Sequence, residues 1–406
     1  MSTGPTLGST TGPVRRVVIT ALGVTQILAW GSSYYLLAVL GTPIAADTGW
    51  SLSIVVGGLS LGLLAGGLAS PAIGRTIEAN GGRPVLAVSS LLLGLGLALL
   101  GSAHHLAVYA AAWLVLGLGM GSGLYDAAFA TLGRAFGVEA RSAIVSLTLW
   151  GGLASTVCWP LTAWLLHTYG WRGACFVYAA VQLGFSLPIH LLLMPRQQPR
   201  LSSSRVPETR IANALAPAQR RAFTLFAVLT TFGGAIASIM SVHLLTFLQM
   251  RGLDLAAAVA LGALFGPAQV AARVVEMTFG NRYHPIWTLA AAKSLIGLAV
   301  VLLLARIPLV GFAVITYGAG NGVWSIARGT MPLALFGASG YATLIGRLAL
   351  FGLLAQALSP SVAAVMLDRF GSDTVLSVLA TMALVNVSVT ATLWVSLARA
   401  KRIGQL

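Results

Sequence analysis

The sequence predicts an all-α membrane protein whose twelve transmembrane helices form two pseudo-symmetric six-helix bundles. Hydrophobic residues make up 57% of the 406 residues and charged residues only 8%, with a mean hydropathy of +0.89. Such values lie far outside the range of soluble globular domains. The apolar runs are continuous rather than alternating, which favours helices over a membrane β-barrel. At about 20 residues per span plus short loops, the chain holds roughly a dozen spans.

The predicted spans are apolar runs separated by Gly, Pro and charged residues. In chain order they are residues 17–40, 53–73, 85–102, 107–131, 144–167, 172–194, 223–249, 255–275, 286–305, 309–333, 343–367 and 374–398. Each is long enough to cross the hydrocarbon core of a bilayer as a helix. The first is too long for the apolar region of a signal peptide, so we expect it to remain in the mature protein.

One long polar stretch, residues 195–221, divides the predicted spans into two groups of six. It is rich in Pro and Ser and carries six arginines against a single acid, Glu208. Such a composition cannot bury a core of its own. We therefore predict three parts: a first bundle over residues 1–194, a basic cytoplasmic linker over 195–221, and a second bundle over 222–406.

The net charge of +15 would indicate nucleic-acid binding in a soluble protein. Here the positions of the basic residues along the chain indicate that they set the membrane topology instead. With a cytoplasmic N-terminus, most of the arginines and Lys401 fall on one side of the membrane, together with the linker and both chain ends. The opposite side receives only Arg172, Arg251, Arg306 and Arg369. This asymmetry follows the positive-inside rule and predicts cytoplasmic termini. The predicted partners are the lipid bilayer and a small-molecule substrate, not nucleic acid.

The two predicted halves carry similar short patterns at nearly constant spacing. Three glycines of the fourth span recur in the tenth, an Arg-x-x-Glu follows both the second and the eighth span, and a Gly and a Pro of the fifth span recur in the eleventh. The pairs are Gly119, Gly121 and Gly123 with Gly318, Gly320 and Gly322; Arg75 and Glu78 with Arg273 and Glu276; and Gly152 and Pro160 with Gly352 and Pro360. Internal duplication of this kind is typical of membrane carriers.

The segment from Gly74 to Arg83, GRTIEANGGR, resembles the signature loop of the major facilitator superfamily, although Ala79 and Pro84 replace residues that are usually basic. The pieces Gly49–Ser51, Leu147–Leu149 and Trp159–Thr162 are similar to bacterial carriers related to monocarboxylate and arsenical-efflux transporters. The resemblance implies the major facilitator fold, a location in the bacterial inner membrane, and secondary active transport in which the two halves rock around a central site.

In such a fold, the loop after the second span and its copy after the eighth can form a cytoplasmic gate. Glu78 can accept hydrogen bonds from backbone N–H groups or pair with Arg134 or Arg347, and Glu276 can do the same with Arg141. The predicted gate residues are Gly74, Arg75, Glu78, Gly81, Arg83, Arg134, Arg141, Arg273, Glu276 and Arg347. The alternative is a solvated loop that only sets topology.

Asp126 is the one acid placed clearly inside a predicted span, and a carboxylate there is costly unless it is paired, hydrated or protonated. Arg328 lies at similar depth in the tenth span, and the resemblance implies that both face the central cavity. Two interpretations compete. Asp126 carries a coupling proton while Arg328 holds an anionic substrate, because guanidinium offers a fixed fork to a carboxylate; or the two neutralise each other as a static pair.

Other polar residues of cavity-facing spans are candidates for substrate contact. In the first span Gln26, Trp30, Ser33 and Tyr34 recur at helical spacing and share one face or its edges; the alternative is helix packing for Ser33 and interfacial anchoring for Tyr34. Ser238 and Asn321 are the candidates from the seventh and tenth spans. Lys293, in a span that the resemblance makes peripheral, is expected to extend towards the cytoplasmic surface.

The sequence lacks the motifs of common soluble enzymes and metal-binding proteins. The only lysines are Lys293 and Lys401, so there is no phosphate-binding GxxxxGK[ST] loop, and neither an HExxH nor an EF-hand pattern occurs. The two cysteines, Cys158 and Cys175, provide no disulfide framework or metal spacing. We therefore expect a transporter without cofactor or metal rather than an enzyme, moving a small organic anion such as a monocarboxylate with proton coupling. The alternatives are an efflux carrier for a drug or arsenical and a transport-inactive sensor; the oligomeric state stays open.

Overall fold

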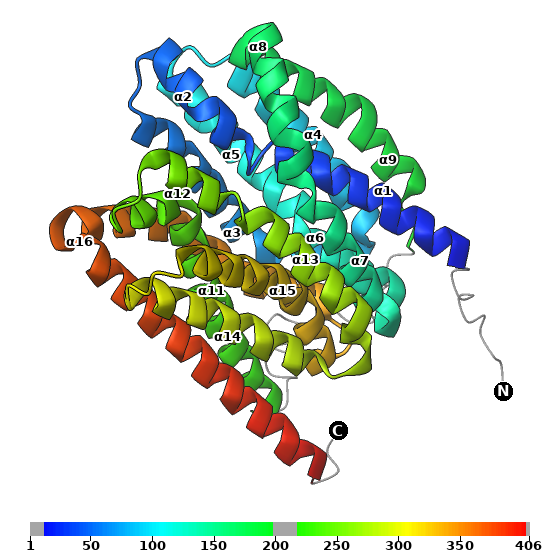
Figure 1. Cartoon of the computed structure of the whole chain (residues 1–406). Coiled ribbons are helices and arrows are strands. Elements are labelled where there is room, and N and C mark those ends of the chain that lie inside the picture. Colours follow the sequence, from blue (N-terminus) through cyan, green and yellow to red (C-terminus); the bar gives the residue numbers. More distant parts are fainter. Residues whose placement is uncertain (1–11, 198–216, 403–406) are drawn as a thin grey trace.

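A computed structural model describes residues 12–197 and 217–402, and these residues are almost entirely helical (Figure 1). The first half consists of α1 (Gly12–Gly31), α2 (Leu36–Thr48), α3 (Leu52–Asn80), α4 (Gly82–Gly101), α5 (Leu106–Gly123), α6 (Tyr125–Phe136), α7 (Ala140–Gly152), α8 (Ala154–Val181) and α9 (Leu187–Leu193), with a 3-10 turn at Gly137–Glu139 and a π-helical turn at Gln182–Ser186. The second half consists of α11 (Pro217–Gln249), α12 (Leu255–Gly262), α13 (Phe265–Phe279), α14 (Pro285–Leu304), α15 (Val310–Phe336) and α16 (Tyr341–Arg402), with a 3-10 turn at Gly280–Arg282.

These helices make twelve passes within the described residues. Nine segments are long and apolar enough to cross a membrane. Two of them, Ala140–Leu193 with 54 residues and Tyr341–Ala398 with 58, would be about 80 Å long if straight, far more than a bilayer core. Each reverses at a glycine with left-handed φ, Gly170 at +71° and Gly371 at +78°, a conformation that other residues rarely adopt. With the 27-residue α15, each predicted span has its helix, and the predicted fold class is confirmed.

Several spans are built from two shorter helices, and these breaks position polar groups. The first pass turns between α1 and α2, the fourth between α5 and α6, the fifth between α7 and α8, and the eighth between α12 and α13. Backbone groups at such breaks have no partner within their own helix and need one elsewhere, because the surrounding lipid offers none.

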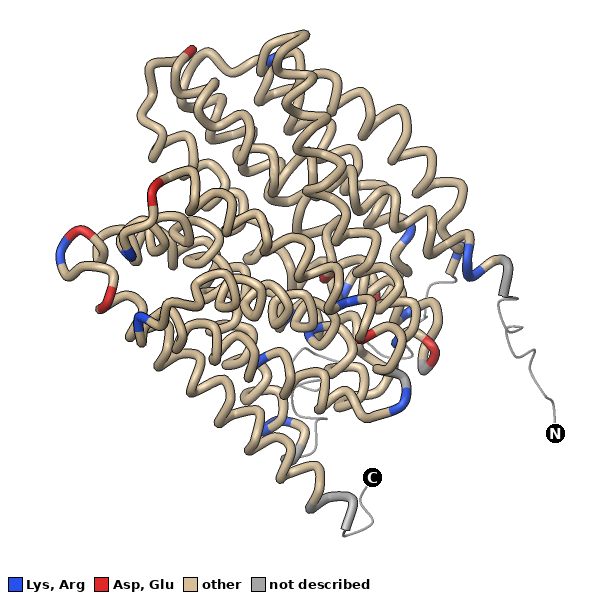
Figure 2. Tube along the Cα trace, in the orientation of Figure 1, with Lys and Arg blue, Asp and Glu red and all other residues tan. Residues whose placement is uncertain are grey.

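The buried apolar residues form three clusters. One belongs entirely to the second half, from Phe226 to Leu393, and one entirely to the first, from Ala29 to Ala179. The third joins the halves on the side where the described chain begins and ends, which we call the termini side. There Ile77, Phe129 and Ile144 belong to the same cluster as Tyr341 and Ile345. Figure 2 shows that the charged residues gather towards the ends of the helices, with basic residues prominent on the termini side.

Backbone packing between α3 and α16 closes the termini side. A Cβ added at Gly74 would lie 2.4 Å from the carbonyl oxygen of Ala342 and 3.0 Å from Cα of Gly346, and one added at Gly346 would lie 2.4 Å from the carbonyl oxygen of Ser70. Small residues at such a crossing let two membrane helices approach closely. Gly74, the first residue of the predicted gate, is therefore part of the contact between the halves.

We expect Gly74→Ala to lower the free energy of unfolding by about 1–3 kcal/mol, because the new methyl group meets backbone that cannot move aside without separating the halves. The matched control is Gly57→Ala on the same helix, where an added Cβ meets nothing within 4 Å and stability should stay within about 1 kcal/mol of wild type. Thermal unfolding in detergent measures both; equal melting temperatures for the two variants would contradict this packing.

Candidate functional site

The break in the fourth pass determines where Asp126 lies. α5 ends at Gly123, Leu124 is extended with φ −79° and ψ −168°, and α6 begins at Tyr125. Asp126 thus occupies the first turn of α6, where free N–H groups and the positive end of the helix dipole stabilise a carboxylate. The glycines before the break favour it, because glycine is a poor helix former. The broken helix therefore places a negative charge where it is partly compensated.

Gln26 stabilises the other end of the same break. Its Nε2 donates to the carbonyl oxygen of Gly123, one of the last carbonyls of α5, and its Oε1 accepts a 3.2 Å hydrogen bond from Nε1 of Trp30. Gln26 is only 1% exposed. Its side chain packs between helices rather than lining an open cavity. Its two hydrogen bonds connect the break in the fourth pass to Trp30 in the first pass.

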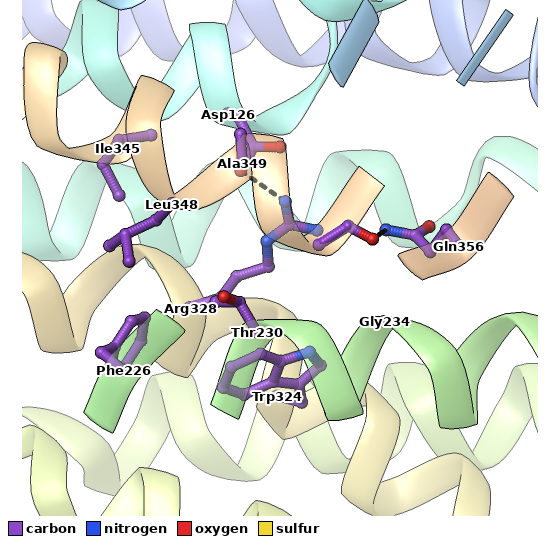
Figure 3. A pocket seen from close by; sticks show the side chains of 11 residues that line it. Asp126, Phe226, Thr230, Gly234, Trp324, Arg328, Ile345, Leu348, Ala349 and Gln356 are labelled. Atoms are coloured by element: carbon purple, nitrogen blue, oxygen red, sulfur yellow. Dashed lines mark hydrogen bonds and ion pairs between the residues drawn. The ribbon is translucent and has the colours of Figure 1, made fainter. Parts of the chain in front are cut away.

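Asp126 and Arg328 form an ion pair that crosses between the halves, from α6 to α15 (Figure 3). Their side chains are 20% and 22% exposed, so the pair is shielded from bulk solvent but not sealed. A pair in such surroundings is held more strongly than one at a protein surface, and losing either partner leaves a costly unpaired charge. The structure thus brings together the two charged residues singled out from the spans.

Two small cavities lie beside this pair, and both are lined by Asp126, Arg328 and Gln356. The cavity in the second half is also lined by Phe226, Thr230, Trp324 and Leu348; the one in the first half is also lined by Trp30, Tyr34, Tyr125 and Met120. Each encloses about 30 Å³, room for about two water molecules. A carboxylate of five or six heavy atoms therefore fits only after side chains or helices move.

The predicted stripe on the first helix divides into two groups. Trp30 and Tyr34 line the first-half cavity and stack edge to face, with ring centroids 5.3 Å apart. Ser33 is fully buried and donates to the carbonyl oxygen of Ala29 in its own helix. The expectation that the whole stripe faces the cavity is therefore corrected for Gln26 and Ser33, because their side chains bond to the carbonyls of Gly123 and Ala29 instead.

The second-half candidates also differ from expectation. Ser238 is 5% exposed and donates a 2.7 Å hydrogen bond to the carbonyl oxygen of Gln356, so it joins α11 to α16 instead of lining a cavity. Asn321 is half-buried and lines neither cavity. Sequence reasoning missed Gln356 and Trp324. Both carry a signal: Trp324 lies one turn before Arg328, and Gln356 is the one amide side chain within the predicted span 343–367.

The first-half gate residues contact one another within their own half. Nε of Arg134 donates a 3.0 Å hydrogen bond to the backbone carbonyl of Glu78, and Gly81, with a positive φ of +81°, follows the end of α3 at Asn80. Arg75 is exposed and Arg83 half-buried. Arg347 is half-buried next to Gly346, at the α3–α16 packing.

The second-half residues of the predicted gate contact the first half, by a route that sequence did not predict. Glu276 is 7% exposed and accepts hydrogen bonds from Oγ1 of Thr288 at 2.6 Å and the hydroxyl of Tyr283 at 3.1 Å. Arg141 does not pair with Glu276; its Nη2 donates to the backbone carbonyls of Gly280 and Tyr283 at 2.5 and 3.0 Å. Burial and the Glu276 carboxylate raise the pKa of Tyr283, so its phenol remains a donor. Glu276 thus orders the loop that Arg141 holds.

Arg273 is a second crossing contact, deeper in the molecule. It is 5% exposed, and its guanidinium donates to the carbonyl oxygen of Thr148 in α7 at 3.1 Å, to Oε1 of Gln269 at 3.1 Å and to the carbonyl oxygen of Gly322 at 3.4 Å. The hydroxyl of Tyr125 donates to the same Thr148 carbonyl at 3.3 Å. Arg273 therefore ties α13 and α15 to α7 of the first half.

A twelve-pass helical membrane protein whose halves meet at a half-buried ion pair beside small cavities has the architecture of a membrane transporter. Among the described residues, no group of three or more His, Cys, Asp or Glu could hold a metal ion. The model of the Major Facilitator Superfamily matches residues 22–360. The chain belongs to this superfamily of transporters.

Relatives and solved structures agree with this membership. Human monocarboxylate transporter 11 is 29% identical over 352 residues, which cover 81% of this chain and 71% of that protein, and its mouse counterpart is 34% identical over 233 residues, covering 53% and 48%. The fold is similar to that of the human organic anion transporter MFSD10, with a TM-score of 0.74 at 17% identity over 93% of this chain and 99% of that one. It is also similar to the fucose:proton symporter of Escherichia coli, with a TM-score of 0.71 at 13% identity over 92% and 98%.

We expect Gln26→Leu to destabilise the protein by about 1–3 kcal/mol, because the Gly123 carbonyl and the Trp30 indole lose a buried partner. Ser33→Ala is the control, since its hydroxyl bonds only within its own helix turn; it should change stability by less than about 0.5 kcal/mol. Thermal unfolding decides, and a Gln26→Leu variant as stable as Ser33→Ala would show that Gln26 does not stabilise the break.

Arg141→Ala should loosen the termini side. It removes two charge-assisted hydrogen bonds between the halves, and a shift of about 1.4 kcal/mol raises the open population roughly tenfold. Maleimide labelling of Ile345→Cys, a 2% exposed position, in a variant lacking Cys158 and Cys175 measures this. Arg282→Ala is the control, because that exposed side chain contacts Phe279 in its own half. Equal labelling rates in both variants would rule out a gating role for Arg141.

Proposed function

We propose that this transporter moves a small organic anion, a monocarboxylate, together with a proton by alternating access. The observation that carries the proposal is the Asp126–Arg328 pair, which joins the two halves and borders both cavities. A guanidinium matches a carboxylate through two parallel N–H donors, so Arg328 is suited to hold the anionic group of the substrate.

The same pair supplies a mechanism for proton coupling. While Asp126 is ionised it occupies the guanidinium of Arg328. Protonation of Asp126 neutralises this competitor, and Arg328 can then accept the carboxylate of the substrate. Proton and anion are thereby bound together, and the net charge of the site is the same empty and loaded. A purely structural ion pair would not exchange Asp126 for the substrate carboxylate, because it would stay intact in both the empty and the loaded transporter.

Alternating access requires contacts between the halves that form on one side and break when that side opens. The α3–α16 glycine packing and the Arg141 contacts with the loop at Gly280 and Tyr283 meet this requirement on the termini side. The concentration of arginines supports a cytoplasmic position for this side, and we propose the inner membrane of a bacterium as the location. In that orientation the structure is closed to the cytoplasm.

The comparisons support the substrate class and the coupling as part of the proposal. Two of the similar proteins are named monocarboxylate transporters, one similar structure is that of an organic anion transporter, and another is that of a proton symporter. The positive residue of the central pair is consistent with an anionic substrate.

We expect Asp126→Asn to abolish the acceleration of pyruvate uptake by an inward proton gradient in proteoliposomes, because the amide cannot carry the proton. Arg328→Ala should abolish thermal stabilisation of the purified protein by pyruvate, which in wild type is stronger at acidic pH. The surface pair Arg306–Asp373, with side chains 69% and 50% exposed, provides matched controls: Arg306→Ala and Asp373→Asn should leave both properties unchanged.

Two results would contradict the proposal. Gradient-driven uptake that survives in Asp126→Asn removes the coupling role and returns the pair to a structural one. Stabilisation of the wild type by arsenite or by cationic drugs alone, indifferent to Arg328→Ala, favours the efflux alternative.

A further inference from the structure

Three residues border both small cavities at the centre of the molecule: Asp126, Arg328 and Gln356. The first two form the ion pair between the halves, and Gln356 is the uncharged member of the set. Each cavity encloses about 30 Å³, so side chains that border both of them lie close to one another. In the view of Figure 3, the Arg328 guanidinium lies between the Asp126 carboxylate and the Gln356 side chain.

Contacts with α11 hold Gln356 in place. Its backbone carbonyl accepts a 2.7 Å hydrogen bond from Oγ of Ser238. A Cβ added at Gly234 would lie 3.4 Å from Cγ of Gln356, so the side chain packs against this glycine. Both contacts position the residue without using its amide group.

The amide group of Gln356 retains most of its hydrogen-bonding capacity. A glutamine amide offers two N–H donors and an oxygen with two lone pairs. Nε2 donates one hydrogen bond, at 3.3 Å to the carbonyl oxygen of Gly352 in the same helix, and Oε1 accepts none from the part of the chain that the structure describes. The side chain is half-buried. A donor and an acceptor are therefore available to a molecule in either cavity.

Other polar side chains of the second half are bonded elsewhere or lie outside the cavities. Arg273 is 5% exposed, and its guanidinium donates to three oxygens. Lys293 does not extend to the membrane surface as expected. It is 1% exposed, its Nζ lies 3.2 Å from the centroid of the Trp324 ring, and it lines neither central cavity. Gln356 is thus the neutral polar group that accompanies Arg328 in both cavities.

We propose that Gln356 determines substrate specificity by binding an oxo or hydroxy oxygen on the carbon next to the carboxylate of the substrate. This inference rests on the proposed function and deepens it, because the substrate class becomes a 2-oxo or 2-hydroxy monocarboxylate. With the carboxylate on Arg328, the neighbouring oxygen lies one carbon away, in the small space that both side chains border. Nε2 donates to an oxo oxygen and Oε1 accepts from a hydroxy group, so one amide serves both. An acid without this oxygen leaves the amide without a partner.

The test compares the dissociation constants of pyruvate and propionate, which differ at that carbon, for wild type, Gln356→Met and Gln249→Met. Titration calorimetry in detergent at neutral pH measures both acids as anions. One such hydrogen bond corresponds to about a three- to tenfold preference, and wild type should favour pyruvate by that factor. Gln356→Met keeps the length of the side chain but not the amide, and should bring the two constants within about twofold by weakening pyruvate alone. Gln249→Met, at an exposed position of α11, should keep the wild-type preference.

Gln356→Asn serves as the second variant if Gln356→Met does not fold. Its amide is one methylene shorter and is drawn back from the cavities, so the preference should be lost here too. Equal binding of the two acids by wild type overturns the role of Gln356, as does a preference that survives in whichever variant folds. Equal weakening of both acids also overturns it and leaves Gln356 a structural role. In each of these cases, pyruvate binding that is lost in Arg328→Ala keeps the proposed function. A wild type that binds neither acid overturns both.

Discussion

A charge inside an apolar helical bundle must be compensated by the protein itself, and this constraint organises the centre of the molecule. Asp126 is stabilised twice, by the first turn of α6 and by Arg328. The first compensation requires the fourth pass to be broken at Leu124, and the break in turn exposes the Gly123 carbonyl, which Gln26 satisfies. The ion pair, the broken helix and the first pass therefore form one connected polar structure between two apolar cores.

The same constraint explains how the halves meet. Between α3 and α16, glycine backbone packs directly on backbone. Where arginines do cross, at Arg141 and Arg273, they donate to main-chain carbonyls of helix ends and loops. Such bonds are satisfied only at one relative position of the halves. They can be exchanged for water when that side opens, which suits a contact that must break in each cycle.

The two arginines near the central site differ in how completely the protein bonds them. Arg273 donates three hydrogen bonds within the protein, whereas Arg328 is neutralised by one carboxylate and is partly exposed. The less completely a cation is bonded within the protein, the more it gains from an arriving anion. The anion affinity of a site thus depends on how many hydrogen bonds and counter-charges each positive group is missing, as well as on the number of positive groups.

The sequence by itself determined the membrane-spanning helices, because apolar runs of about 20 residues have few other stable forms. It also singled out Asp126 and Arg328 as candidates, since a charge within an apolar run stands out whichever way its helix faces. It did not determine that Ser33 and Ser238 face helix neighbours, that Lys293 turns inward, that Arg141 binds carbonyls rather than Glu276, or that Gln356 borders both cavities. Only the tertiary structure decided these contacts. They depend on the rotation of each helix about its axis and on the position of main-chain carbonyls at breaks and loops, and the identity of a single residue specifies neither.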